Sequence, residues 1–235
     1  MARITRKELK SDKFALEVEQ TFTFFEEHQQ ELLRYGGAAV VVIALAAGLW
    51  YYRGHQHTAR EAALGRAIQV QEAAVGPPPP GATTISAFPT QQVKEEAATK
   101  VFADLKSKYS GSDEADIASF YLGTIQTDQG KLAEAEKTFQ DVASKGDANY
   151  ASLAKLSLGE IYVAQGKVDE GRKILEDLAA HPTIFVSKEQ AQLALARALS
   201  PTKPAEARKI LEPLRTIPGP IGQVAIQLYV ALPPS

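Results

Sequence analysis

Two stretches of the sequence decide the fold, LGTIQTDQGKLAEAEKTF at residues 122–139 and LGEIYVAQGKVDEGRKIL at residues 158–175. They begin 36 residues apart, and each carries a Leu-Gly pair, a Gly-Lys pair eight residues later and a large apolar residue at its end. Apolar residues recur at helical spacing, without the two-residue alternation that is typical of strands. This internal period predicts an all-α array of helix pairs that stack on one another.

A third copy of the pattern runs from Leu195 through Ala207 and Leu211, again near the 36-residue period. The glycine of each Leu-Gly pair lets two helices approach closely, and the Gly-Lys turn reverses the chain between them. These are landmarks of a tetratricopeptide repeat, although the usual Trp is missing and Gly171 stands where Ala is usual. We interpret residues 90–235 as a degenerate tetratricopeptide-like α-solenoid of three to four helix pairs with a C-terminal capping helix.

Breakers and caps place the helices of this array. Glycines and prolines punctuate it at regular intervals, for example at Gly130, Gly166 and Pro220. The expected helices cover residues 90–109, 113–129, 131–145, 148–165, 167–180, 187–199, 203–216 and 220–232.

Upstream of the array, residues 53–75 have helix-forming composition, and we expect a juxtamembrane helix there. Residues 76–89, GPPPPGATTISAFP, follow it. Four consecutive prolines exclude a helix and favour an extended, stiff conformation, so this segment is predicted to be a Pro-rich linker.

Residues 35–52, YGGAAVVVIALAAGLWYY, carry no charged side chain. An 18-residue helix is about 27 Å long, close to the thickness of the hydrocarbon core of a bilayer. We therefore predict a single transmembrane helix; a buried core helix or a cleaved signal peptide are the alternatives. Aromatic and basic residues at both ends are typical of membrane-interface anchors, namely Arg34, Tyr35, Trp50, Tyr51, Tyr52 and Arg53.

The distribution of positive charge predicts the orientation. Six Lys or Arg residues precede the span, and three follow it over a similar length. Positive charge is retained in the cytoplasm, which places the N-terminus inside and the C-terminal domain outside. In a bacterium this predicts an inner-membrane protein with one pass and a periplasmic C-terminal domain.

The first 34 residues form a basic arm, and within it residues 12–34 read as an amphipathic helix. Phe14, Val18, Phe22 and Phe25 recur near one helical face. The helix is expected either to lie on the inner membrane surface or to dock on a partner through these phenylalanines.

The first helix of each repeat is expected to present polar residues to a groove that holds an extended peptide or a partner segment. The candidates are Thr124, Asp128, Glu160 and Gln192. Ordinary solvated helix positions are the alternative for each of them.

Composition and motifs give no sign of chemistry. A chain without cysteine has no thiolate nucleophile or zinc-thiolate site, and a net charge of −2 does not favour nucleic-acid binding. His55 and His57 lie two residues apart and would diverge on a helix. Neither a phosphate-binding glycine loop nor a nucleophile motif occurs. We predict a protein that is not an enzyme and uses no cofactor, metal or small-molecule substrate.

The order of features, with TFTFFEEHQQ before the span, LWYYR at its exit and degenerate repeats behind it, resembles the YfgM-type family. These are ancillary subunits of the SecYEG translocon. The Pro-rich segment at 76–89 departs from the family pattern. The resemblance implies a chaperone-like scaffold in the inner membrane, with the lipid bilayer, a SecYEG-type translocon and periplasmic chaperones as partners.

Two other functions stay open at this point. The span and the phenylalanine-striped arm also suit a structural or assembly subunit of another membrane complex. An enzyme or signalling module would need a pocket of convergent polar groups, which the sequence does not indicate.

Overall fold

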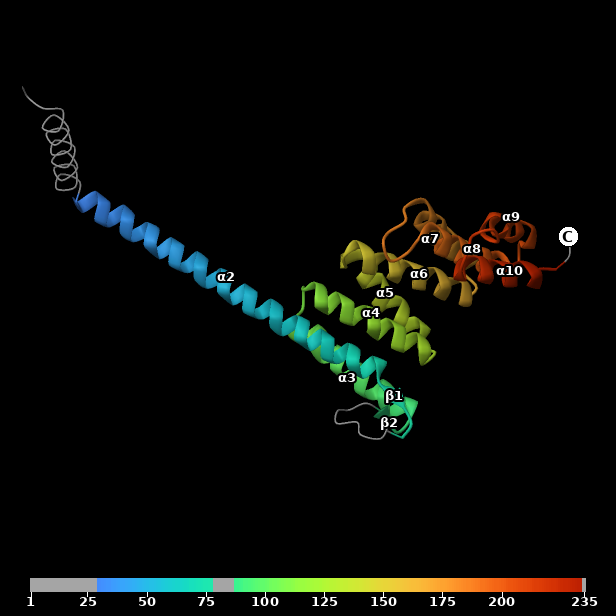
Figure 1. The fold of residues 1–235 in the computed structure, drawn as a ribbon, viewed down its shortest axis with the longest axis horizontal. Coiled ribbons are helices and arrows are strands. Elements are labelled where there is room, and N and C mark those ends of the chain that lie inside the picture. The colour runs from blue at the N-terminus through green and yellow to red at the C-terminus, as the bar shows by residue number, and fades with distance from the viewer. Residues whose placement is uncertain (1–28, 78–86, 234–235) are drawn as a thin grey trace, which may run out of the picture. The chain divides into compact units, whose positions relative to one another are not determined.

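The computed structural model describes residues 29–77 and 87–233. Two compact units divide between Ala59 and Arg60. In chain order the elements are α2 (Gln29–Glu72), β1 (Ala74–Val75), β2 (Ala87–Phe88), α3 (Gln91–Lys108), α4 (Asp113–Asp128), α5 (Leu132–Lys145), α6 (Ala148–Ala164), α7 (Val168–Ala180), α8 (Lys188–Leu199), α9 (Pro204–Leu214) and α10 (Pro220–Ala231), as Figure 1 shows.

The first unit contains the N-terminal part of α2, whose apolar side chains are exposed. Val40, Ile43 and Leu45 each expose more than half of their surface. Within the part of the chain that the structure describes, no helix is both long and apolar enough to cross a membrane. The amphipathic helix expected at 12–34 falls mainly on residues before 29, which lie outside the described residues.

In the second unit, α3 to α10 all begin and end within two residues of the expected helices. Local signals explain this agreement. The hydroxyl oxygens of Ser112 and Ser187 accept backbone N–H groups at the starts of α4 and α8. Gly130 and Gly166 have positive φ angles of 73° and 81° and turn the chain between helices. The predicted all-α solenoid is confirmed.

The helices pack as pairs, and the last part of α2 supplies the first helix of the first pair. The helix expected at 53–75 is thus the C-terminal end of α2, which runs unbroken to Glu72. Its residues 60–72 contribute Ala67 to a core shared with Phe102 of α3 and Ala118 of α4. Arg60 also pairs with Glu114 of α4, with 3.3 Å between Nε and Oε2.

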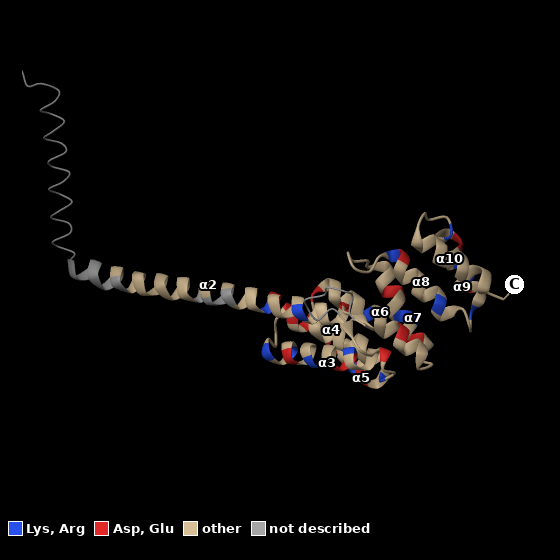
Figure 2. Ribbon diagram, turned by 60° about the horizontal axis from the view of Figure 1, so that its bottom comes forward, with Lys and Arg blue, Asp and Glu red and all other residues tan. Residues whose placement is uncertain are grey.

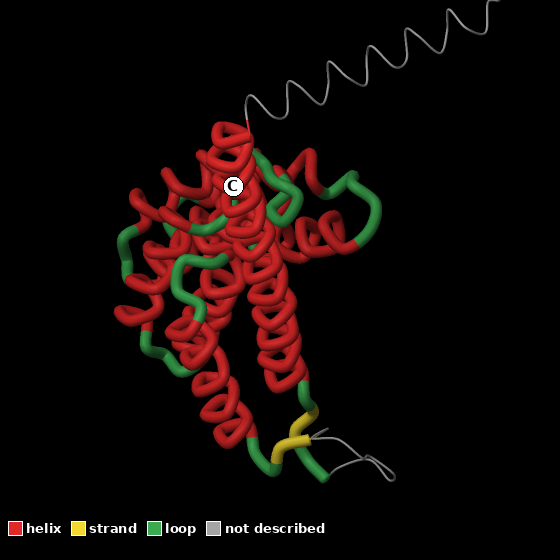
Figure 3. Tube along the Cα trace, turned by 90° about the vertical axis from the view of Figure 1, so that its left-hand side faces the viewer, coloured by secondary structure: helices red, strands yellow, loops and turns green. Residues whose placement is uncertain are grey.

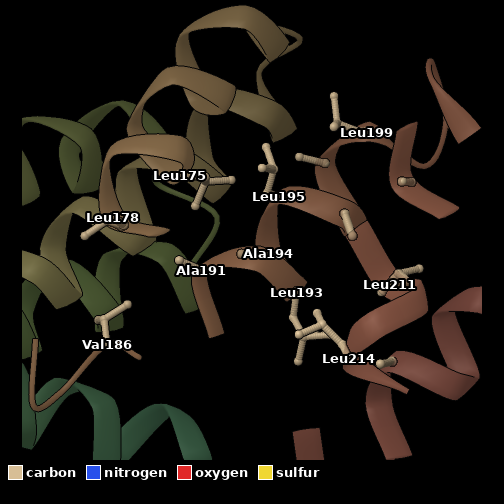
Figure 4. Close-up of a cluster of buried hydrophobic side chains, with 14 of the residues drawn as sticks. Leu175, Leu178, Val186, Ala191, Leu193, Ala194, Leu195, Leu199, Leu211 and Leu214 are labelled. Carbon is tan, nitrogen blue, oxygen red and sulfur yellow. The ribbon is translucent and has the colours of Figure 1, made fainter. Parts of the chain in front are cut away.

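The later pairs are α4–α5, α6–α7 and α8–α9, and α10 closes the stack. Figure 4 shows the largest core cluster, in which Leu175 of α7 and Leu195 of α8 lie with Leu211 of α9. The α10 helix packs on this cluster through Ala225, and its Tyr229 ring lies beneath the guanidinium of Arg215 at 4.0 Å. The predicted C-terminal capping helix is present.

The two short strands flank the Pro-rich segment. β1 and β2 pair in parallel, with Ala74 opposite Ala87 and Val75 opposite Phe88 (Figure 3). The N–H of Gly76 also donates to the carbonyl of Phe88 over 2.9 Å. The chain is therefore held together on the two sides of this segment, where residues 74–76 contact residues 87–88.

Candidate functional site

The first helices of three successive pairs, α4, α6 and α8, form one surface of the second unit, which we call the first-helix face. Three of the four predicted groove residues meet there. Thr124 and Asp128 of α4 and Glu160 of α6 line one pocket of about 320 Å³. Gln192 lies half-buried on α8 and lines neither this pocket nor the next one.

Close packing of helices forms the floor of this pocket. A Cβ atom on Gly123 of α4 would lie 2.7 Å from the Phe139 ring of α5, so the glycine is needed for the two helices to approach. The Phe139 ring is only 1% exposed and closes the bottom of the pocket. Leu132 and Ile161 add further apolar surface to the lining.

Polar groups at the rim of the first pocket present hydrogen-bond acceptors. Thr124 donates its hydroxyl proton to the carbonyl of Phe120 over 3.2 Å, and Thr127 donates to that of Gly123 over 2.9 Å. Both hydroxyls therefore offer lone pairs outward. Asp128 is exposed, and among the described residues it has no ion-pair or hydrogen-bond partner.

A second pocket of about 260 Å³ adjoins the first and shares Glu160 and Ala164 with it. Its remaining lining is mostly aliphatic, with Leu175 fully buried. Arg197 of α8 stands at the rim, 3.8 Å from the Glu160 carboxylate. Both side chains are more than half exposed, so this ion pair is a weak one.

The first-helix face carries charges of both signs, but the charged side chains that line the first pocket are all acidic. Figure 2 shows Asp, Glu, Lys and Arg residues interspersed along α3 to α7. Among the described residues, no Lys or Arg lines the first pocket, whereas Arg197 lines the second. The two pockets therefore differ in electrostatics although they lie side by side.

The two pockets also contain residues that the sequence pattern did not predict. Thr127 and Ser157 line the first pocket, and Val163 and Arg197 line the second. Each lies three residues from a pocket residue on the same helix, which is about one turn. Adding such positions to the predicted groove would have found Thr127, Ser157 and Val163, whereas Arg197 lies five residues from the predicted Gln192 and would still have been missed.

The predicted membrane-interface residues all lie on α2. Tyr35, Trp50 and Tyr51 are 75%, 79% and 73% exposed. Arg34, Tyr52 and Arg53 occupy α2 at the expected positions, and their side chains are not described.

No group of three or more His, Asp or Glu side chains in the described parts of the chain is placed to hold a metal ion. The surface is built from acceptors, carboxylates and apolar floors. Such groups can bind a polypeptide segment by hydrogen bonds and burial.

Comparison with known proteins gives one family match. The model of the family described as "Tetratricopeptide repeat-like domain" matches residues 24–190. A search of curated proteins found no match by sequence. Among solved structures, the chain is similar to the nearly identical TPR-like repeats assigned to a kinesin light chain of Podosopora anserina. The identity is 18% and the TM-score 0.48, over 59% of this chain and 77% of that one.

Proposed function

The chain belongs to the tetratricopeptide repeat-like domain family, and from this we propose that it is a non-enzymatic scaffold that binds protein partners on its first-helix face. Repeats of this kind act as protein-interaction surfaces. The observation that carries the proposal is the pair of adjoining pockets across α4, α6 and α8. They combine apolar floors with hydrogen-bond acceptors at the rim, of which the Asp128 carboxylate has no ion-pair or hydrogen-bond partner among the described residues.

Photocrosslinking tests this assignment. A photoreactive amino acid at Ser157, inside the first pocket, should form adducts with partner proteins in living cells. The matched control is Lys137 of α5, which is exposed and lines neither pocket. Equal adducts at both positions, or none at Ser157, would contradict a binding role for this face.

A membrane anchor at residues 35–52 is the second part of the proposal. It is supported by the absence of charged residues in this stretch and by the exposure of its side chains on α2. Val40, Val41, Val42, Ile43 and Leu45 are 58% to 66% exposed. Burial of such a surface in lipid is strongly favourable.

The excess of Lys and Arg before this stretch supports an inner-membrane protein whose N-terminus lies in the cytoplasm and whose repeat domain lies in the periplasm. The chain should sediment with membranes, and a reporter joined after Ser235 should be active only outside the cytoplasm. Recovery of the intact chain in the soluble fraction would refute the anchor.

The resemblance to the YfgM-type family supports a finer assignment, a chaperone-like scaffold beside a SecYEG-type translocon. On this proposal the adducts formed at Ser157 contain translocon subunits, periplasmic chaperones or chains that emerge from the translocon. Adducts with other proteins alone would reject the translocon and leave the scaffold in place.

The exposed apolar side chains of α2 also favour a second candidate, a structural or assembly subunit of another membrane complex. Such side chains can pack against the spans of other subunits. A stable, stoichiometric complex after purification in mild detergent would favour this candidate, and a chain that migrates alone would count against it.

A further inference from the structure

The two pockets of the first-helix face occupy the same place in successive repeats. Thr124 and Asp128 on α4 correspond to Glu160 and Ala164 on α6, 36 residues further along the chain. Phe139 on the floor of the first pocket corresponds in the same way to Leu175 on the floor of the second. The repeat therefore builds one kind of pocket twice, and substitutions at equivalent positions give each copy its own chemistry.

We propose that this pair of pockets binds an extended segment of the partner through two anchors, a Lys or Arg in the first pocket and an aliphatic side chain in the second. This inference rests on the proposed scaffold function and specifies the chemistry of the bound segment.

The first pocket has the groups that a basic side chain requires. Asp128 and Glu160 supply negative charge, and the Thr124 and Thr127 hydroxyls present only lone pairs because their protons are donated to α4 carbonyls. A Lys ammonium has three donors and no acceptor, which matches this set. The long methylene stem would lie over the apolar floor at Phe139, while its charged head stays near water.

The second pocket has the opposite preference. In place of Asp128 it has Ala164, 36 residues further along, and in place of Ser157 it has Ala194, 37 residues further along, so an acidic and a hydroxyl group are replaced by methyl groups. The cation at Arg197 disfavours a second basic side chain at the rim. Its volume of about 260 Å³ accommodates one aliphatic side chain such as Leu, Ile or Val.

The spacing of the pockets limits the spacing of the anchors. Packed helices lie about 8–10 Å apart, and an extended chain advances about 3.3 Å per residue. The basic and aliphatic residues of the partner should therefore be about three positions apart.

Synthetic peptides test this proposal on the full chain in detergent micelles. The probes are fluorescein-labelled Gly-Ser decapeptides that carry Lys and Leu three positions apart, in both orders, and fluorescence anisotropy measures binding. In the better order, we expect at least tenfold weaker binding when Glu replaces Lys or when Ser replaces Leu.

Two sets of variants assign these preferences to the pockets. Asp128→Asn combined with Glu160→Gln should reduce the Lys-over-Glu preference to less than threefold and keep the dependence on Leu. Ala164→Leu, an exposed position shared by both pockets, should weaken binding of every peptide tenfold or more. The controls Asp104→Asn and Ala133→Leu change exposed positions outside both pockets and should leave binding unchanged.

Equal binding of all peptides, no binding of any, or a Lys preference that survives the double substitution would overturn the proposal. Failure of the two-anchor proposal can be distinguished from failure of the scaffold function. Adducts at Ser157 without a peptide preference would keep the first-helix face as the binding surface and reject the two anchors. A failure at Ser157 would reject both.

Discussion

Gly159 and Gly171 face each other where α6 packs against α7. A Cβ atom on Gly171 would lie 2.6 Å from the carbonyl oxygen of Gly159. Tetratricopeptide repeats usually have Ala at this position, as at Ala135 and Ala207 in the neighbouring repeats. The departure from the pattern therefore has a physical cause, which is an unusually close approach of two helix backbones.

Gly171→Ala should lower the free energy of unfolding by about 1–3 kcal/mol, because a backbone carbonyl cannot move aside as a side chain can. Urea unfolding followed by circular dichroism measures this loss. The control is Gly65→Ala, an exposed helical position where a Cβ meets nothing within 4 Å, which should stabilise by about 0.5–1 kcal/mol. A neutral Gly171→Ala would contradict the close packing.

Of the charged residues that the structure describes, Glu114 is the most buried one that pairs across helices. It is 7% exposed and pairs with Arg60, which is the first residue of the second unit. Glu114→Gln should cost about 1–3 kcal/mol, because it removes the charge that Arg60 pairs with in a partly desolvated site.

The matched control for Glu114 is Glu176→Gln, since Glu176 pairs with Arg172 on the exposed surface of α7. That substitution should change stability by less than about 0.5 kcal/mol. Urea unfolding measures the free energy of unfolding of both variants. Equal decreases in the two variants would show that burial of the Arg60–Glu114 pair adds nothing to its contribution to stability.

At the scale of elements, Glu136 connects α5 to the turn between α6 and α7. Its carboxylate accepts the side-chain N–H of Gln165 over 3.0 Å and lies 3.6 Å from the Lys167 ammonium. The Gln165 hydrogen bond, followed by the charge of Lys167, lowers the pKa of Glu136 from its ordinary value of 4.5. The ionised form is therefore favoured in the folded state.

A lowered pKa adds stability above pH 4.5, and this stability disappears as the pH falls through the folded-state pKa. Glu136→Gln should cost about 0.5–1 kcal/mol at pH 7, where the partly exposed site is screened by solvent. The difference from the wild type should shrink below pH 4.5. Urea unfolding at pH 7 and pH 3 measures it, and an unchanged difference would contradict the assigned role.

At the scale of the molecule, the compact unit that contains the repeats begins at Arg60, inside α2. Residues 60–72 cover Ala98 and Phe102 of α3, both of which have no exposed surface. Each helix pair in the stack buries its apolar face against a neighbour. The apolar face of α3 therefore needs residues 60–72 to cover it.

A fragment of residues 60–235 should therefore unfold cooperatively, whereas a fragment of residues 90–235 should bind a dye for exposed apolar surface and melt at a lower temperature. Loss of the cover over Phe102 alone exposes side-chain surface worth about 1.5–3 kcal/mol. Thermal unfolding and dye binding measure both effects. Equal stability of the two fragments would place the domain boundary after α2.

The sequence by itself determined the helices of the repeat domain and their pairing. Caps such as Ser112 and Ser187 and turn glycines such as Gly130 act within a few residues, so helix ends can be read locally. The 36-residue period also placed Thr124, Asp128 and Glu160 on one face, and they share a pocket.

Only the tertiary structure decided which surfaces find partners. It packed residues 60–72 against α3, paired β1 with β2 on the two sides of the Pro-rich segment, and left Gln192 outside both pockets. These outcomes depend on contacts between segments that are distant in the chain. Periodicity shows which face of a helix is apolar, but not which neighbour will cover it.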